Sequence, residues 1–446
     1  MIKNRYWKRA LQIAWPSVLE SFFIALAGLI DTFMVSSIGP NAVAAIGLTT
    51  QPKFIALSFF IAISVSVSAL VARRKGEQDK KMANQTMVTA MIVALLLCLI
   101  ISSVFVIFTP QILKLSGSSP DTHDLGVSYF RIIMGGLIFN VISMTINAGQ
   151  RGSGNTQIAF TTNLVSSLVN ILFNYLLING NLGFPKLGVA GAGLATVLGT
   201  IVAAIMSFSS LFRRSSYMSF KLIKKYALGF SNFIFKEILA LGSNIFVENI
   251  AARIGFLVTA ITAAKLGTDQ FAAHNVGMNL LSLSFSFGDG MQVAAVALTG
   301  NALGARKKDE AIKYGKTCQE IGLSISIIIS IILVLFRKNI FRMFFDDEKI
   351  IAMGSIITFY LIFIVIFQIS QIIFGGALRA AGDVKYTLAV SLISITFIRS
   401  AATLFFVNVL HLGIQGIWMG IMADQISRFV GLWTRFRKGD WVNIEI

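Results

Sequence analysis

Five acidic residues lie inside long apolar stretches of this chain, where charge is costly. They are Glu20, Asp31, Glu248, Asp289 and Asp424. Near the centre of a bilayer a charged side chain costs roughly 3 kcal/mol on insertion scales, so such residues usually face a protein interior or an aqueous cavity. Acids in these positions therefore indicate the binding of protons, ions or substrates.

Two of these acids share one face of the first apolar stretch, residues 9–39. In an α-helix the spacing of Glu20 and Asp31 is just over three turns, or about 16 Å. Pro16, one turn before Glu20, removes a backbone donor and favours a kink. We expect Glu20 to line a polar cleft and Pro16 to act as a hinge, with static packing as the alternative for the proline.

Asp31 and Glu248 are the strongest candidates for coupling transport to an ion or proton. Neither has an oppositely charged residue three or four positions away on its own helix. The alternative is that a buried arginine from another stretch neutralises each of them, and Arg131, Arg253 and Arg399 are available.

The remaining two acids differ in their surroundings. Asp289 lies between glycines in FSFGDGMQ, where a closely approached backbone is expected, and it suits an ion site or a structural cap equally well. Asp424 and Arg428 are four apart with the acid first, which favours a structural ion pair.

An amide pair adds polar groups to another apolar stretch. Asn170 and Asn174 in LVNILFNYLLI are four residues apart and so share a helix face. Amides within spans more often join helices than bind ligands. Taken by themselves, these two are interpreted as helix contacts.

The composition identifies the kind of protein that positions these groups. Of 446 residues 55% are hydrophobic and 13% charged, with a mean hydropathy of +0.77, which is typical of a polytopic membrane protein. Two cysteines in apolar runs and three scattered histidines provide neither a disulfide framework nor a metal centre. No cofactor and no certain metal are expected, and the first apolar run is interpreted as a retained span.

Windows of about 20 apolar residues predict an all-α membrane protein with twelve spans. The predicted spans are approximately 10–38, 47–72, 87–109, 126–149, 157–179, 187–212, 237–266, 272–303, 314–336, 351–378, 386–410 and 413–434.

The chain also contains an internal duplication. An offset of 228 relates Glu20 to Glu248, Arg151 to Arg379, and matching glycines and alanines across more than 100 residues. Six spans return the chain to its starting side, so the two halves form a parallel repeat. We predict an N-terminal lobe at 1–212, a basic linker at 213–236 and a C-terminal lobe at 237–446.

The net charge of +18 indicates topology rather than nucleic-acid binding. Most Lys and Arg residues fall at the N-terminus, at the even-numbered connections and at the C-terminus, and the few on the other side include Lys53. Both termini are therefore predicted to be cytoplasmic, in a multi-pass protein of the cell membrane.

Six stretches resemble motifs of the multidrug and toxic compound extrusion (MATE) family, and together they extend over nearly the whole chain. They are IDTFMVSSIGPNAVAAIG at 30–47, GQRGSGNTQIA at 149–159, NGNLGFPKLGVAGAGLAT at 179–196, AAKLGTDQFAAHNVG at 263–277, ALTGNALGARKKDEA at 297–311 and ALRAAGDVKYT at 377–387. The resemblance implies two six-helix lobes around a central cleft.

For the N-terminal lobe the resemblance also assigns roles to residues. Asp31 matches the family's first-helix aspartate, which is protonated or takes part in cation binding, and Pro16 matches the proline of the helix that bends. Asn170 and Thr196 match polar residues of the same pocket. Asn174 departs from the pattern, because many prokaryotic members have an aspartate there. A Na⁺ site near Asp31, Asn170 and Asn174 is one option.

In the C-terminal lobe Glu248 resembles the family's seventh-helix glutamate. The tenth helix lacks the aspartate of the sodium-coupled type and offers only Gln368 and Gln371, which we place in the substrate cleft. The C-lobe sodium site is therefore incomplete.

The sequence thus predicts a secondary antiporter that exports amphipathic, cationic organic compounds in exchange for inward H⁺ or Na⁺, with H⁺ favoured. Carboxylates in a low-dielectric cleft attract a cation, and a proton or Na⁺ that neutralises them weakens that attraction. The alternatives are a flippase of the same superfamily, for which arginines would be expected in the cleft, and an intramembrane enzyme. The expected partners are small organic substrates, the coupling ion and the lipid bilayer. Nucleic acid is not expected as a partner, and the protein is expected to be a monomer.

Overall fold

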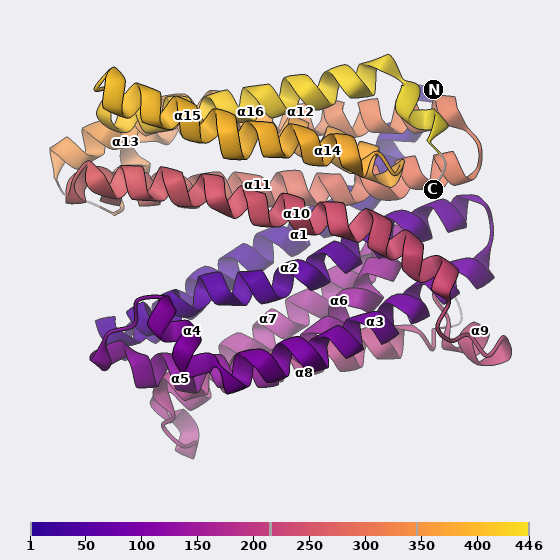
Figure 1. Ribbon diagram of the computed structural model, residues 1–446, viewed down its shortest axis with the longest axis horizontal. Helices are drawn as coiled ribbons and strands as arrows, with labels where there is room; N and C mark the ends of the chain where they lie inside the picture. Colours follow the sequence, from indigo (N-terminus) through magenta and orange to yellow (C-terminus); the bar gives the residue numbers. More distant parts are fainter. Residues whose placement is uncertain (1, 214–215, 345–346, 445–446) are drawn as a thin grey trace. The chain divides into compact units, whose positions relative to one another are not determined.

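The computed structural model describes residues 2–213, 216–344 and 347–444, and all regular structure in these residues is helical (Figure 1). The helices of the first half are α1 Ile2–Ser36, α2 Pro40–Gly76, α3 Lys80–Ile107, α4 Thr109–Leu115, α5 Pro120–Gly135, α6 Leu137–Gly152, α7 Thr156–Asn179, η1 Asn181–Gly183, α8 Gly188–Ser210 and α9 Phe220–Lys225. The second half contains α10 Asn232–Lys265, α11 Thr268–Gly304, α12 Lys308–Arg342, α13 Glu348–Ala380, α14 Val384–Ser391, η2 Leu392–Ile398, α15 Arg399–Leu404, η3 Phe405–Val409, α16 Gly413–Lys438 and η4 Asp440–Asn443. The segments η2 and η3 are π-helical.

All twelve predicted spans coincide with helices, so the prediction of an all-α protein with twelve spans is confirmed. Ten helices of the described chain are long and apolar enough to cross a membrane, and the pair α5 and α6, bent by 45°, gives an eleventh. The bend lies at Gly136, where a Cβ would come within 2.5 Å of the Val197 side chain on α8. The twelfth, α16, carries Asp424 and Arg428 within its length and a basic last turn.

The internal duplication is visible in the backbone. Gly39 before α2 and Gly267 before α11 have φ angles of 133° and 110°. Gly154 and Gly382, which follow the repeat-related helices α6 and α13, have φ angles of 80° and 88°. Residues with a side chain rarely adopt these angles, so each copy needs glycine at the same two turns.

The chain folds into two compact units, Leu19–Gly242 and Ser243–Ile446 with Met1–Val18. Helix α1 therefore contributes its first half to the C-terminal unit and its second half to the N-terminal unit. Helix α10 is divided in the opposite order, with its residues up to Gly242 in the N-terminal unit and the rest in the C-terminal unit. Ala10 and Ala14 of α1 are buried in the core of the C-terminal unit. The predicted division at 1–212, 213–236 and 237–446 stays a prediction.

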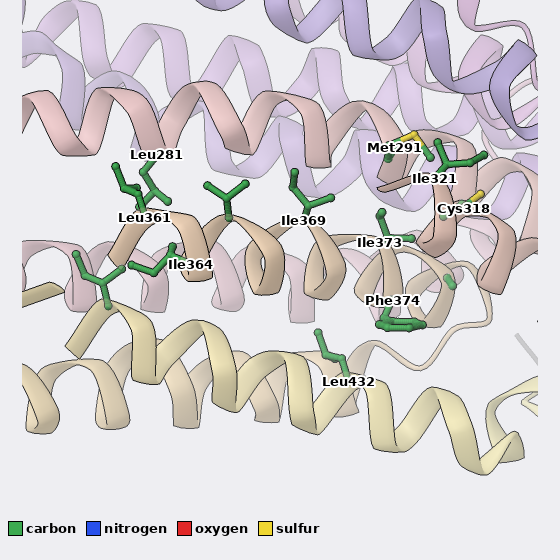
Figure 2. Close-up of a cluster of buried hydrophobic side chains, with 14 of the residues drawn as sticks. Leu281, Met291, Cys318, Ile321, Leu361, Ile364, Ile369, Ile373, Phe374 and Leu432 are labelled. Atoms are coloured by element: carbon green, nitrogen blue, oxygen red, sulfur yellow. The ribbon is translucent and has the colours of Figure 1, made fainter. Parts of the chain in front are cut away.

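Helix α13 is the central element of the C-terminal unit, where it packs against α11, α12 and α16. Figure 2 shows its side chains Ile369, Ile373 and Phe374 directed into this core. A Cβ on Gly322 of α12 would lie 2.2 Å from Ile373 Cδ1. The close approach of α12 to α13 therefore depends on a glycine, as is common where helices pack within membranes.

In the N-terminal unit α6 packs against α2, α3, α7 and α8. Gly152 of α6 faces α2, because a Cβ there would come within 2.4 Å of the Ser68 carbonyl oxygen. A Cβ on Gly191 of α8 would likewise lie 2.5 Å from the Leu177 carbonyl oxygen of α7. These contacts bring α7 and α8 together, and both helices carry residues of the site described below.

The predicted basic linker is held against α3 rather than extended freely from the unit. The buried Asn84 side chain accepts a hydrogen bond from the Ser219 backbone N–H at 2.8 Å and donates to the Tyr217 carbonyl oxygen at 3.2 Å. Gln85 donates to the Gly229 carbonyl oxygen at 2.6 Å. The linker therefore has a defined path over the N-terminal unit.

Asn84→Ala is expected to loosen this segment. The change leaves a backbone N–H and a carbonyl group without their partner, which costs about 1–3 kcal/mol when such groups remain buried. We expect faster trypsin cleavage within 213–236 in the detergent-purified protein. Asn41→Ala, at an exposed asparagine of α2, is the control and should leave the cleavage rate unchanged.

Candidate functional site

The structure brings together four of the polar residues predicted for the N-terminal lobe. Both Asp31 of α1 and the amides of α7 belong to the same unit, and Asn174 Nδ2 donates to Asp31 Oδ1. In the amide orientation that satisfies its neighbours, Asn170 donates to the two Asp31 oxygens at 2.7 and 3.2 Å and accepts from Thr196 Oγ1 at 3.2 Å. The i,i+4 spacing on α7 thus directs two amides at one carboxylate.

A cavity of about 180 Å³ opens beside this carboxylate. Asp31, Thr50, Tyr129, Asn174 and Thr196 provide polar groups to its wall, and the remaining lining residues are apolar. The volume would hold several water molecules or a small organic group, since one water occupies about 30 Å³ of the liquid. The cavity combines an apolar wall with few polar groups, as binding sites for small molecules usually do.

Lys53 lies close to this cavity. The predicted span 47–72 contains it, although the charge count placed it on the outer side. It lies about four turns inside α2, next to Pro52, within the candidate span Asn41–Gly76. It lines a second cavity of about 30 Å³ that shares Thr196 with the first. No ion pair within 4.0 Å joins it to a described carboxylate, and its ammonium acts electrostatically on Asp31. Helix α2 continues through both Pro52 and Lys53, in agreement with the predicted span 47–72.

The polar groups around Asp31 suit the binding of a proton or a small hard cation. Asp31 receives hydrogen bonds from two neutral amides, and Asn174 Oδ1 is buried without a hydrogen-bond partner in the described part of the chain. Asp31, Asn174 and Thr196 could present oxygen ligands to Na⁺ if the amides turned. No group of three or more His, Cys, Asp or Glu side chains that could hold a metal occurs among the described residues.

Glu20 is bound within the N-terminal unit by groups from two other helices. Arg151 and Asn163, which follow it by 131 and 143 positions, both donate to Glu20 Oε1. Its side chain is 3% exposed and lines neither cavity. The predicted place of Glu20 in a substrate cleft therefore stays a prediction, and the geometry shows a structural ion pair.

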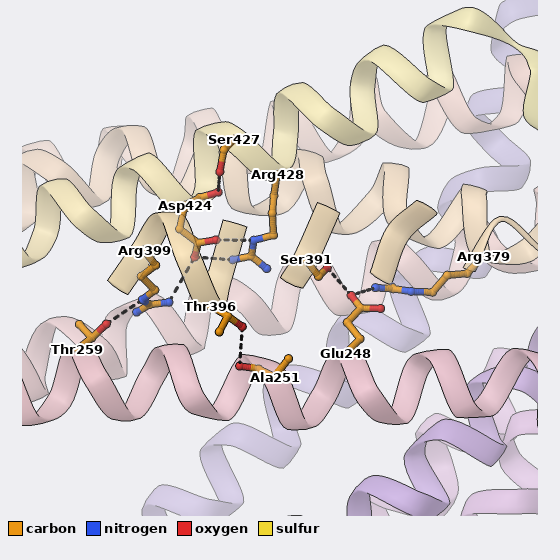
Figure 3. A network of polar contacts seen from close by, with 10 residues as sticks. All are labelled: Glu248, Ala251, Thr259, Arg379, Ser391, Thr396, Arg399, Asp424, Ser427 and Arg428. Atoms are coloured by element: carbon orange, nitrogen blue, oxygen red, sulfur yellow. Dashed lines mark hydrogen bonds and ion pairs between the residues drawn. The ribbon is translucent and has the colours of Figure 1, made fainter. Parts of the chain in front are cut away.

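Glu248 in the C-terminal unit has the same environment (Figure 3). Arg379 Nη2 and Ser391 Oγ donate to Glu248 Oε1, each at 2.7 Å, and they too follow the glutamate by 131 and 143 positions. An arginine partner was the alternative to a coupling role, but Arg379 was not among the three arginines considered. The offset of 228 already paired Arg151 with Arg379, so the repeat contained the signal for both networks.

The predicted pair on α16 is confirmed, because Arg428 Nε lies 2.9 Å from Asp424 Oδ1. Arg399 joins the same carboxylate from α15, with Nη1 at 3.4 Å from Asp424 Oδ2. Arg131, by contrast, lies exposed on α5 and lines neither cavity.

The other predicted C-lobe residues are not among the lining residues of either cavity. Asp289 is half-buried on α11, and the glycines beside it are closely approached, as expected: a Cβ on Gly290 would lie 2.5 Å from Val18 Cα. Gln368 and Gln371 are 4% and 6% exposed on α13. Their assignments to an ion site and a substrate cleft stay predictions.

Two copies of one family pattern account for most of the chain. The MatE family model matches residues 16–176 and again 245–403, which are the two halves of the duplication. The chain belongs to the MatE family. The MATE resemblance of the sequence motifs is thereby confirmed.

Similar proteins agree with this assignment. The chain is 25% identical over 434 residues to the probable multidrug resistance protein NorM of Thermotoga maritima, covering 97% of this chain and 93% of that protein. It is 26% identical to the probable NorM of Pasteurella multocida over 97% and 94% of the two chains. An outward-facing multidrug resistance MATE transporter of the MOP superfamily shares the fold, with a TM-score of 0.89, 22% identity and coverage of 98% and 96%. This MatE protein is a multi-pass membrane transporter.

Proposed function

We propose that this MatE transporter exports amphipathic organic cations across the cell membrane, with both termini cytoplasmic, in exchange for an inward cation that competes at Asp31. The Asp31 carboxylate in the wall of the 180 Å³ cavity is the observation that carries the proposal. The relatives named as multidrug resistance proteins support the substrate class.

The charges beside the cavity indicate how exchange would work. With Asp31 ionised, its carboxylate can accept a cationic substrate. With Asp31 neutralised by a proton or another cation, that attraction is lost. Substrate and coupling ion therefore compete for the same carboxylate.

A proton is the coupling ion that these residues favour. Proton coupling needs a single acid with a suitable environment, whereas a sodium site needs several oxygen ligands, generally including carboxylates. Asp31 is the one acid among the described residues that line the cavity, and Asn174 stands where many prokaryotic members of the family have an aspartate. Both amides already direct nitrogen rather than oxygen at the carboxylate.

The arginines that would suggest a flippase do not line the cavity. Arg131 lies on the exposed surface of α5. Arg399 is wholly buried and bound to Thr259 and Asp424. An anionic lipid-linked substrate therefore finds no arginine in the cavity wall beside Asp31.

Dye efflux from proteoliposomes with imposed gradients tests the proposal. We expect efflux of a cationic dye under an inward proton gradient without sodium, and none when an uncoupler collapses that gradient. Efflux that survives the uncoupler under a sodium gradient and stops without sodium would overturn proton coupling. Absence of dye transport under both gradients would overturn the antiport proposal itself.

A further inference from the structure

The C-terminal unit contains a counterpart of the Asp31 site with a different charge. Thr259 of α10 occupies the position 228 residues after Asp31. The same offset relates Asn163 to Ser391, and the π-helical turn η2 follows directly after Ser391. A π-turn accommodates an extra residue, so beyond it Arg399 becomes the counterpart of Asn170. The contact of Asn170 with Asp31 is matched by that of Arg399 Nε with Thr259 Oγ1 at 3.1 Å.

Arg399 is buried without a full set of partners. Its side chain is 0% exposed, and the guanidinium lies over the Phe256 ring at 4.4 Å from the ring centroid. Nε donates to Thr259 and Nη1 makes a long hydrogen bond of 3.4 Å to Asp424, but Nη2 has no acceptor among the described residues. A buried N–H group without an acceptor costs about 1–3 kcal/mol, and more when the group is charged.

Asp424 cannot fully balance this charge, because another arginine already binds it. Figure 3 shows Arg428 facing the Asp424 carboxylate with two hydrogen bonds, both of 2.9 Å, from Nε and Nη2. Two guanidinium groups therefore share one carboxylate. The cluster of Arg399, Asp424 and Arg428 keeps one uncompensated positive charge inside the unit.

Two further buried polar atoms in the same unit lack partners. They are His274 Nδ1 and Trp418 Nε1, whose rings lie 5.7 Å apart, and neither atom has a hydrogen-bond partner in the described chain. Arg399 also acts electrostatically on His274.

We propose that Arg399, together with Thr259, forms a binding site for a compact monoanion, either chloride or the carboxylate group of a solute. One negative charge would complete the Arg399–Asp424–Arg428 cluster and accept the hydrogen bond that Nη2 offers. A water molecule would satisfy the N–H but leave the charge uncompensated. The π-helical segments η2 and η3 on both sides of α15 support the assignment, since such turns are frequent at functional sites.

Anion-dependent thermal stability of the detergent-purified full-length protein tests this site. Sodium concentration and ionic strength are held constant while chloride, bromide or acetate replaces a bulky sulfonate. A ligand that binds only the folded state stabilises it in a saturable way. We expect the apparent Tm to rise by about 2–4 °C and then level off. Saturation with the halides alone identifies chloride, and saturation with acetate identifies a carboxylate group.

Thr259→Asp introduces the carboxylate that the N-terminal unit has at the equivalent position. It gives Arg399 an internal counter-ion, so we expect the Tm of this variant to become independent of the anion. Thr259→Asn, which adds a neutral side chain of nearly the same size, is the matched control and should keep the dependence. Dependence that persists in Thr259→Asp, or is missing from the unmodified protein, overturns the proposal.

If Thr259→Asp does not fold, bromide located by anomalous diffraction tests the proposed anion site at Arg399. Bromide within hydrogen-bond distance of Arg399 Nη2 supports the site, and bromide elsewhere or nowhere in the C-terminal unit overturns it. These measurements use no gradient and no dye. Their failure is therefore distinct from a failure of the proposed antiport at Asp31.

Discussion

Asp31→Asn is expected to reduce gradient-driven dye efflux to the level of empty liposomes while leaving the folded protein intact. The amide has the size of the carboxylate but cannot change charge, so substrate and proton no longer compete. Asn170 and Asn174 now donate to Asp31, and either amide can turn its oxygen toward the new NH₂ group. The local hydrogen bonds are therefore retained, and we expect a Tm within a few degrees of the unmodified protein.

The matched control is Asp309→Asn, the same chemical change at an exposed aspartate in the first turn of α12. It should leave both efflux and Tm unchanged. Normal gradient-driven efflux by Asp31→Asn would show that Asp31 is structural and that the exchange mechanism is wrong.

Glu248→Gln should mainly destabilise the C-terminal unit. The change leaves Arg379, 16% exposed, without its counter-ion, and removing one partner of a buried pair is strongly destabilising. We expect the free energy of unfolding to fall by about 3 kcal/mol, which lies at the lower end of the range for buried pairs. The apparent Tm in detergent and efflux per folded molecule, measured on one preparation, separate stability from transport.

Glu20→Gln is the internal comparison, since Glu20 has the equivalent arginine and a polar residue at the same spacings. Both variants should lower Tm by similar amounts. An unchanged Tm with abolished efflux in Glu248→Gln alone would instead establish Glu248 as a coupling residue.

The twelve spans could be predicted from the sequence because span length and glycine turns are local properties of the chain, and the 228-residue offset is visible when its two halves are compared. Part of the Asp31 site was also predictable. The spacing of Asn170 and Asn174 places them on one face, and the family resemblance brings that face to Asp31.

Other features depend on packing that no local pattern encodes. Lys53 was counted with the charges of the outer side, but α2 carries it to a cavity that shares Thr196 with the Asp31 site. Arg151 and Arg379 lie in the last turns of α6 and α13, so they were interpreted as topology charges although both reach inward to glutamates. The π-turn before Arg399 shifts the register of the repeat, and only the backbone reveals it.

The two equivalent glutamate networks also indicate the order in which features of this molecule arose. An arginine and a polar side chain at the same spacings after Glu20 and Glu248 are most simply inherited from a single six-helix ancestor that existed before the duplication. Asp31 and Thr259, in contrast, occupy equivalent positions with different chemistry, so at least one of them changed after the copies separated. Because parallel halves have the same orientation, that ancestor could have worked as a pair of identical chains. On this interpretation the glutamate networks are older than the duplication. The difference in charge between the Asp31 and Thr259 positions arose after it, once each half could evolve separately.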